Sequence, residues 1–184
     1  MINPNLSRLQ GPNLTLRLVQ PRDASYLYGL RVNPAYNLHL SQVRGTAEDQ
    51  RHWIEAYKTR EAEGCELYYI IERHDGQACG TVRLYDIKAD SFTWGSWILD
   101  AGKPPKAALE SAVLVYRIAF DLLGLRIAQF DVRRDNETTL AFHRRFGATQ
   151  THTSETDAFF TYPRTQYDAD LERHMGVLRG VAAE

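Results

Sequence analysis

The chain has 184 residues, which is enough for one domain of ordinary size and too few for two large ones. Hydrophobic residues make up 43% of it and charged residues 24%, a balance that excludes a disordered chain and predicts a soluble globular protein. From the length we expect a single domain over residues 1–184. The 22 basic and 23 acidic residues give a net charge of −1, so no nucleic-acid or membrane partner is expected.

The first third of the chain alternates between strand-like and helical patterns. Residues 13–18 alternate leucine with polar side chains, which predicts a half-buried strand, and Asp23 suits the first turn of a short helix after it. Residues 33–45 are irregular and rich in asparagine and aromatic side chains. Thr46, with Asp49 three residues later, predicts a capping box and a second helix.

The middle of the chain reads as strands followed by one strong helix. Residues 66–73 and 78–87 predict two antiparallel strands joined by an Asp-Gly hairpin, and residues 91–99 predict a third strand. The helix runs from about residue 106 to residue 123, Gly124 caps it, and its largely apolar surface predicts burial against a sheet. Its polar residues fall on one narrow stripe: Glu110, Arg117 and Asp121.

The last third predicts a strand, a helix and two more strands. Residues 126–133 form the strand, residues 135–146 the helix with Gly147 as its cap, and residues 148–163 the final pair of strands. A strand–helix–strand unit requires a parallel pair, whereas the hairpins require antiparallel pairs. The pattern therefore predicts an α/β (α+β) fold with a mixed sheet.

Three features gather around this strand–helix–strand unit. The loop 100–106 leads into a helix N-terminus, where free backbone N–H groups favour the binding of an anion. Lys103 and Lys106 add positive charge there, and the alternative interpretation is an ordinary solvated loop that contains lysines. Asn136 begins the next helix, and its alternative role is a helix cap. His143 lies two turns later on the same helix face, and its alternative role is a packed core histidine.

These segments give the chain a family resemblance. The sequence "DVRRDNETTLAFHRRFGA" (residues 131–148) is similar to the segment "V...N..A...Y.K.GF" of the GCN5-related N-acetyltransferase (GNAT) superfamily, and residues 107–132 match the helix and strand before it. The chain resembles RimJ/RimL-like members, and residues 31–33 and 52–53 resemble a branch that acetylates amino groups on nucleotide-linked sugars. The resemblance implies a GNAT fold: a mixed, mostly antiparallel sheet of about seven strands, a central splayed parallel pair and about four flanking helices.

The resemblance also implies an acetyl-CoA site between the strands 91–99 and 126–133. The family's glycine-rich phosphate loop is replaced here by lysine, proline and alanine, although backbone N–H groups remain. The implied contacts are Trp97, Ile98 and Leu99 for pantetheine, Lys103, Lys106, Ala107, Ala108 and Leu109 for the pyrophosphate, and Asn136 for either part.

Acetyl transfer needs a neutral amine, support for the carbonyl oxygen and a proton for the departing thiolate. His143 stands where the family most often has its proton-donating tyrosine, so we expect it to be the general acid. Backbone N–H groups of the central strand, with Gly95 permitting a bulge, would support the oxygen. The candidates for the base are Asp100, Tyr85, Asp86 and a water relay.

The acceptor is expected to enter beside the irregular segment of the first third. The residues that we expect to contact it are Arg31, Asn33, Tyr36, Asn37, Tyr85 and Trp94. The leading hypothesis is an acetyl-CoA-dependent N-acetyltransferase acting on a small-molecule amine, such as an amino sugar on a nucleotide carrier. The alternatives are a protein N-terminal acetyltransferase of the ribosomal-protein type and a noncatalytic acyl-CoA-binding module.

Several other classes are not expected. Two cysteines cannot build a disulfide framework, and the first ten residues lack the apolar core of a signal peptide, so the expected location is cytoplasmic. No metal is expected, because the six histidines are scattered and neither H-E-x-x-H nor C-x-x-C occurs. Family members are often homodimers, and the aromatic strand 157–163 could pack internally or against a partner copy.

Overall fold

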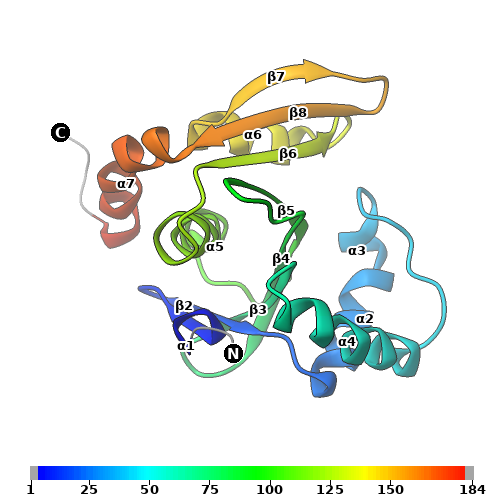
Figure 1. Cartoon of the computed structure of the whole chain (residues 1–184). Coiled ribbons are helices and arrows are strands. Elements are labelled where there is room, and N and C mark those ends of the chain that lie inside the picture. The colour runs from blue at the N-terminus through cyan, green and yellow to red at the C-terminus, as the bar shows by residue number, and fades with distance from the viewer. Residues whose placement is uncertain (1–3, 181–184) are drawn as a thin grey trace.

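The computed structural model describes residues 4–180, which form an eight-stranded sheet in the order β1-β2-β3-β4-β5-β6-β8-β7 with helices on both faces (Figure 1). The strands are β1 (Arg8–Gln10), β2 (Leu14–Leu18), β3 (Leu67–Arg73), β4 (Ala78–Tyr85), β5 (Ser91–Leu99), β6 (Ile127–Arg133), β7 (Thr149–Thr153) and β8 (Asp157–Pro163). The helical segments are α1 (Pro4–Ser7), η1 (Pro21–Asp23), α2 (Ala24–Val32), α3 (Pro34–Asn37), α4 (Ala47–Ala62), α5 (Ala107–Tyr116), η2 (Arg117–Leu122), α6 (Glu137–Phe146) and α7 (Arg164–Arg179).

One parallel pair joins two antiparallel halves of this sheet. Strands β5 and β6 pair only at Ser91 with Ile127 and at Phe92 with Ala128, whereas the other neighbouring pairs are antiparallel. Beyond these two pairs the strands diverge, so β5 keeps an unpaired edge facing β6 in the described part of the chain. The mixed, mostly antiparallel sheet with a splayed central pair is confirmed, with β1 as a strand that the sequence pattern did not predict.

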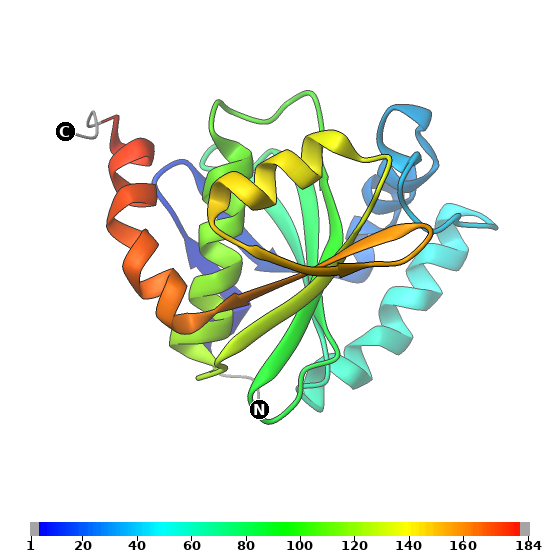
Figure 2. The ribbon, with the colours of Figure 1, turned by 90° about the horizontal axis from the view of Figure 1, so that it is seen from above.

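Both faces of β3 are buried, which explains its continuous apolar sequence. Tyr69 and Ile71 enter the large core on the side of α5, while Tyr68 and Ile70 enter a smaller core together with Ile54 of α4. Successive side chains of a strand point to opposite faces, so a strand covered on both sides shows no polar alternation. Figure 2 shows α5 and α7 side by side and α4 on the opposite side of the sheet.

The local helix signals are confirmed where they depend on neighbouring residues. Thr46 and Asp49 form the capping box of α4, and Gly147 ends α6 in the left-handed region with φ 116°. The described residues form seven α-helices, of which α1 and α3 have only four residues each, against about four expected. Helix α7, which packs against α5, is the long helix that the sequence pattern missed.

The first residue of the polar stripe on the strong helix, Glu110, is buried. The strong helix is α-helical over α5 and continues as the π-helical segment η2. The Glu110 residue is only 1% exposed, whereas Arg117 is exposed to solvent. The Glu110 carboxylate accepts hydrogen bonds from the backbone N–H groups of Asn13 and Leu14 at 2.7 and 2.8 Å. Glu110 therefore ties the start of β2 to α5.

In residues 4–180, the helices are all too short or too polar to cross a membrane.

Candidate active site

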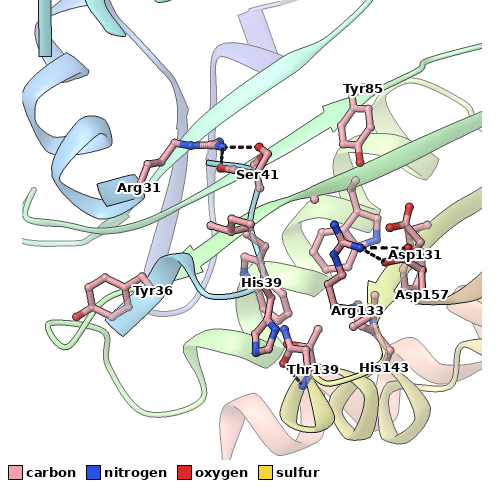
Figure 3. A pocket seen from close by; sticks show the side chains of 18 residues that line it. Arg31, Tyr36, His39, Ser41, Tyr85, Asp131, Arg133, Thr139, His143 and Asp157 are labelled. Atoms are coloured by element: carbon pink, nitrogen blue, oxygen red, sulfur yellow. Dashed lines mark hydrogen bonds and ion pairs between the residues drawn. The ribbon is translucent and has the colours of Figure 1, made fainter. Parts of the chain in front are cut away.

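A cavity of about 400 Å³ lies where β5 and β6 diverge (Figure 3). It is lined by residues from α2, α3 and the segment after α3, from β4, β5, β6 and β8, and from α6 and its N-cap. Figure 3 shows Arg31 and Ser41 toward one end and Asp131, Asp157 and His143 toward the other. The cavity therefore combines the open edge of β5 with polar and titratable groups from both halves of the sheet.

A bulge shapes the wall that β5 contributes. The pairing of β4 with β5 shifts between Thr81 and Arg83, and Ser96 in the bulge has a left-handed φ of 47°. A bulge was expected at Gly95, but the left-handed residue is Ser96. At Gly95 the backbone passes close to Tyr85, and a Cβ there would lie 3.2 Å from the Tyr85 hydroxyl. The bulge frees backbone groups at a point where both Gly95 and Ser96 line the cavity.

His143 is buried in an aromatic environment at the inner end of the cavity. It is 4% exposed, and its ring centroid lies 4.4 Å from that of Phe130 and 5.4 Å from that of Trp94. Burial lowers its pKa from 6.5 to about 3, and its Nδ1 atom has no hydrogen-bond partner among the described residues. His143 is therefore neutral near pH 7, so that it can act there through a neutral N–H group and not as an imidazolium.

The depressed pKa of His143 has a measurable consequence for stability. Between about pH 6.5 and pH 3 only the unfolded chain binds a proton at this residue, so its contribution to stability falls as the pH falls. At pH 5 this loss amounts to about 2 kcal/mol. We expect His143→Leu to reduce the fall in the free energy of unfolding between pH 7 and pH 5 by about that amount, as measured by urea denaturation.

The same replacement at His52, which is exposed on α4, is the matched control. Buried His174 also has a lowered pKa, caused first by desolvation, so a smaller slope of the same sign remains in the His143 variant. A His143→Leu protein that loses stability as steeply as the wild type below pH 6.5 would contradict the burial argument.

Two carboxylates face the cavity from neighbouring strands. Asp157 of β8 pairs with Arg133 at 3.4 Å, whereas Asp131 of β6 makes no ion pair with any residue in 4–180. Desolvation, and then the charge of Asp157, raises the pKa of Asp131 above its ordinary value. Tyr85 lies near enough for the Asp131 charge to raise its pKa further, after burial as the main cause. Asp131 is thus an unpaired carboxylate suited to holding an ammonium group and accepting its proton.

Asp131 was not among the residues expected from the sequence. It lies within a strand in which alternate side chains are buried, where a polar residue at an exposed position is ordinary. The available signal was weak: Asp131 is an acidic residue on the parallel strand that borders the splay.

The cavity brings together part of the expected site. The expected residues that line it are Arg31, Tyr36, Tyr85, Trp94, Trp97, Asn136 and His143. The expected residues outside its lining are Asn33, Asn37, Ile98, Leu99, Asp100, Lys103, Lys106, Ala107, Ala108 and Leu109. The helix-cap alternative for Asn136 is confirmed as well, because its side chain accepts a hydrogen bond from the Thr139 N–H at the start of α6. The Asn33 side chain caps α3 in the same way, a role that the sequence pattern did not predict.

Asp100 is placed unlike a base. Its carboxylate lies at the end of β5 and accepts hydrogen bonds from the Tyr26 hydroxyl at 2.8 Å and from the Gly102 N–H at 2.7 Å. These bonds fix the turn that follows β5, and Asp100 does not line the cavity. The geometry favours Asp131 over Asp100 for contact with an amine.

The start of α5 keeps the character of an anion site, although not in the expected way. Lys106 adopts a left-handed φ of 64° at the N-cap, and its Nζ atom donates to the Val177 carbonyl of α7 at 2.5 Å. Its charge is thus directed to α7. The Ala107 N–H donates to the Pro104 carbonyl at 3.3 Å, whereas the N–H groups of Ala108 and Leu109 lie in the first turn, at the positive end of α5. Lys103 is exposed in the loop before the helix.

The described part of the chain contains no group of three or more histidine, cysteine, aspartate or glutamate residues arranged to hold a metal ion.

A family model described as an acetyltransferase (GNAT) domain matches residues 13–149. Among curated proteins, the chain is similar to the SPbeta prophage-derived uncharacterized N-acetyltransferase YokL of Bacillus subtilis. The two are 24% identical over 139 residues, which cover 74% of this chain and 76% of that protein.

Solved structures show the same architecture. The apo form of FdhC, described as a nucleotide-linked sugar GNAT, is 37% identical with a TM-score of 0.85 and covers 91% of this chain and 96% of its own. A spermidine N-acetyltransferase from Vibrio cholerae, in complex with CoA and spermine, is 16% identical with a TM-score of 0.74, covers 85% of this chain and 99% of its own, and shows the fold alone. The family model spans most of the chain, and the sheet has the expected splay, so this protein belongs to the GNAT acetyltransferase family and is an N-acetyltransferase.

Proposed function

We propose that this enzyme transfers an acetyl group from acetyl-CoA to the primary amine of a small molecule, and that the amine belongs to a nucleotide-linked amino sugar. The observation that carries the proposal is the unpaired Asp131 carboxylate in the cavity at the splay, which the neutral His143 also lines. The likeness to a nucleotide-linked sugar GNAT at 37% identity supports the choice of acceptor.

The residues around the splay fit an acyl-CoA. The unpaired edge of β5 offers backbone groups that an extended pantetheine could pair with as an added strand, beside Trp97, Ile98 and Leu99. The first-turn N–H groups of α5 are suited to a diphosphate. Trp97 is held in place by donation from its indole Nε1 to the Ser111 hydroxyl at 3.1 Å. When bound, acetyl-CoA supplies the activated acetyl group.

The side chains then divide the chemistry among them. Asp131 holds the ammonium group and removes one proton, which leaves a neutral amine to attack the thioester carbonyl. The carbon–nitrogen bond forms and the carbon–sulfur bond breaks, and the electron pair leaves with the sulfur as a thiolate. The nitrogen, which carries one proton too many after its attack, releases that proton to water, and the thiolate takes a proton from water, so that a neutral amide and a thiol result. Backbone N–H groups freed at the β5 bulge stabilise the oxygen that becomes negative. The neutral His143 N–H donates a hydrogen bond to the sulfur.

Thiol release from acetyl-CoA with a panel of amines tests this function. We expect release with an amino sugar on a nucleotide carrier and little or none with a peptide that has a free N-terminus. Release with the peptide alone would support the protein N-terminal alternative. Binding of acetyl-CoA without release by any amine of the panel would overturn the proposed acceptor class.

A further inference from the structure

A second cavity, of about 420 Å³, opens beside the first one. It lies between the segment after α3, the start of α4 and strands β3 to β5. Arg31, Ser41 and Ser96 line both cavities, so the two spaces are neighbours across these residues. We call the second space the arginine cavity, because three arginines line it: Arg31, Arg44 and Arg83.

The arginine cavity has more positive than negative charge. Arg83 pairs with Glu66, which also binds Arg60 at 2.5 Å, so one carboxylate serves two arginines. Within residues 4–180, neither Arg31 nor Arg44 has a carboxylate partner. Arg31 instead donates from Nη2 to the carbonyl and the hydroxyl of Ser41, which leaves its charge uncompensated.

The one carboxylate in the lining is already engaged. Asp49 accepts hydrogen bonds from the backbone N–H of Thr46 at 2.7 Å and from its hydroxyl at 2.8 Å, in the capping box of α4. These bonds lower the pKa of Asp49, the side-chain bond from Thr46 being the main cause. The carboxylate thus serves the helix cap, and the arginines remain available to an anion.

Two buried polar groups in the arginine cavity lack partners. The hydroxyl of Tyr68, a residue only 1% exposed, lies close to Arg31 and Thr81 without forming a hydrogen bond of normal geometry with either. The Nε atom of Arg31 is also buried and unpartnered among the described residues. Buried donors are nearly always satisfied in proteins, so unsatisfied ones beside uncompensated arginines indicate a place for an acceptor-rich ligand.

We propose that the arginine cavity binds the diphosphate of the acceptor, while the amine of the same molecule reaches Asp131 in the neighbouring cavity. The inference rests on the proposed function and specifies how its substrate class is recognised. Guanidinium groups bind phosphate oxygens in a bidentate manner. Three arginines and a tyrosine hydroxyl are donors suited to an anionic group, whereas a neutral sugar would not require their positive charge. The start of α5, where the diphosphate of CoA is expected, is a separate site, so the two anionic groups do not compete.

Titration calorimetry of the full chain with a nucleoside diphosphate tests the site without any acetyl transfer. We expect Arg44→Ala to weaken binding about tenfold to a hundredfold, as the loss of a charged hydrogen-bond partner predicts. Tyr68→Phe removes only the unpartnered hydroxyl, so it should weaken binding several-fold without lowering the unfolding free energy. Arg22→Ala, at an exposed arginine outside both cavities, should leave binding as it is.

Kinetics with two acceptors complete the test. The ratio of kcat/KM for a nucleotide-linked amino sugar to that for the phosphate-free amino sugar should fall about tenfold or more in Arg44→Ala. No binding of the diphosphate, or equal binding to wild type, Arg44→Ala and Arg22→Ala, would overturn the proposed site. Diphosphate binding that depends on Arg44, together with no thiol release by any amine, would instead overturn the proposed function.

Discussion

Asp131→Asn should lower kcat for acetyl transfer by about a hundredfold to ten-thousandfold, the usual effect of removing a general base. The asparagine amide has nearly the same size as the carboxylate but cannot take a proton from an ammonium group. Because Asp131 makes no ion pair with any described residue, its replacement breaks no salt bridge. The loss should therefore appear in the rate, with the unfolding free energy close to that of the wild type.

The pH profile identifies the group that is lost. Desolvation and the neighbouring Asp157 raise the pKa of Asp131, and the base works only when ionised, so wild-type kcat should fall as the pH drops through that raised pKa. Asp131→Asn has no group that titrates at this position, so its residual kcat should lack this decrease. His143 does not produce the decrease near neutral pH, because its pKa is lowered to about 3.

Asp100→Asn is the matched control for this experiment. It is the same substitution at a carboxylate that accepts hydrogen bonds from Tyr26 and Gly102 outside the cavity. We expect it to alter stability and to keep the decrease of kcat at low pH. If Asp100→Asn abolished that decrease and Asp131→Asn retained it, the assignment of the base would be reversed.

The parts of the fold that depend on neighbouring residues could be predicted from the sequence. Thr46 and Asp49 cap α4 through atoms three residues apart, and Gly147 ends α6 because only its own backbone conformation is involved. The mixed sheet followed from the order of strands and helices, since a strand–helix–strand unit requires a parallel pair. Asn136 and His143 reach one cavity for the same local reason, their spacing along α6.

The parts that depend on distant segments could not. The Lys106 side chain is directed toward Val177, a residue 71 positions away on a helix that the sequence pattern did not reveal. Asp131 becomes unusual only once Asp157 and Tyr85 lie beside it, and they come from two other strands. The left-handed conformation of Ser96 arises from a register shift against β4, which no property of serine indicates.

Glu110→Ala should destabilise the fold by about 3–5 kcal/mol, in the range for removing one partner of a buried charged interaction. The Glu110 carboxylate accepts three hydrogen bonds, from the backbone N–H groups of Asn13 and Leu14 and from the Asn13 side chain at 3.0 Å. Removing it leaves N–H groups at the start of β2 facing a buried side chain of α5 that cannot accept a hydrogen bond. Each such group costs about 1–3 kcal/mol.

Urea denaturation at pH 7 measures this loss, and Arg117→Ala is its control on the same stripe of the helical segment. Arg117 is exposed, so its replacement should change the unfolding free energy by less than about 0.5 kcal/mol. Glu110→Gln keeps one acceptor oxygen but turns an NH₂ group toward the N–H donors, so its loss should fall between the two. Equal effects of Glu110→Ala and Arg117→Ala would mean that Glu110 does not join β2 to α5.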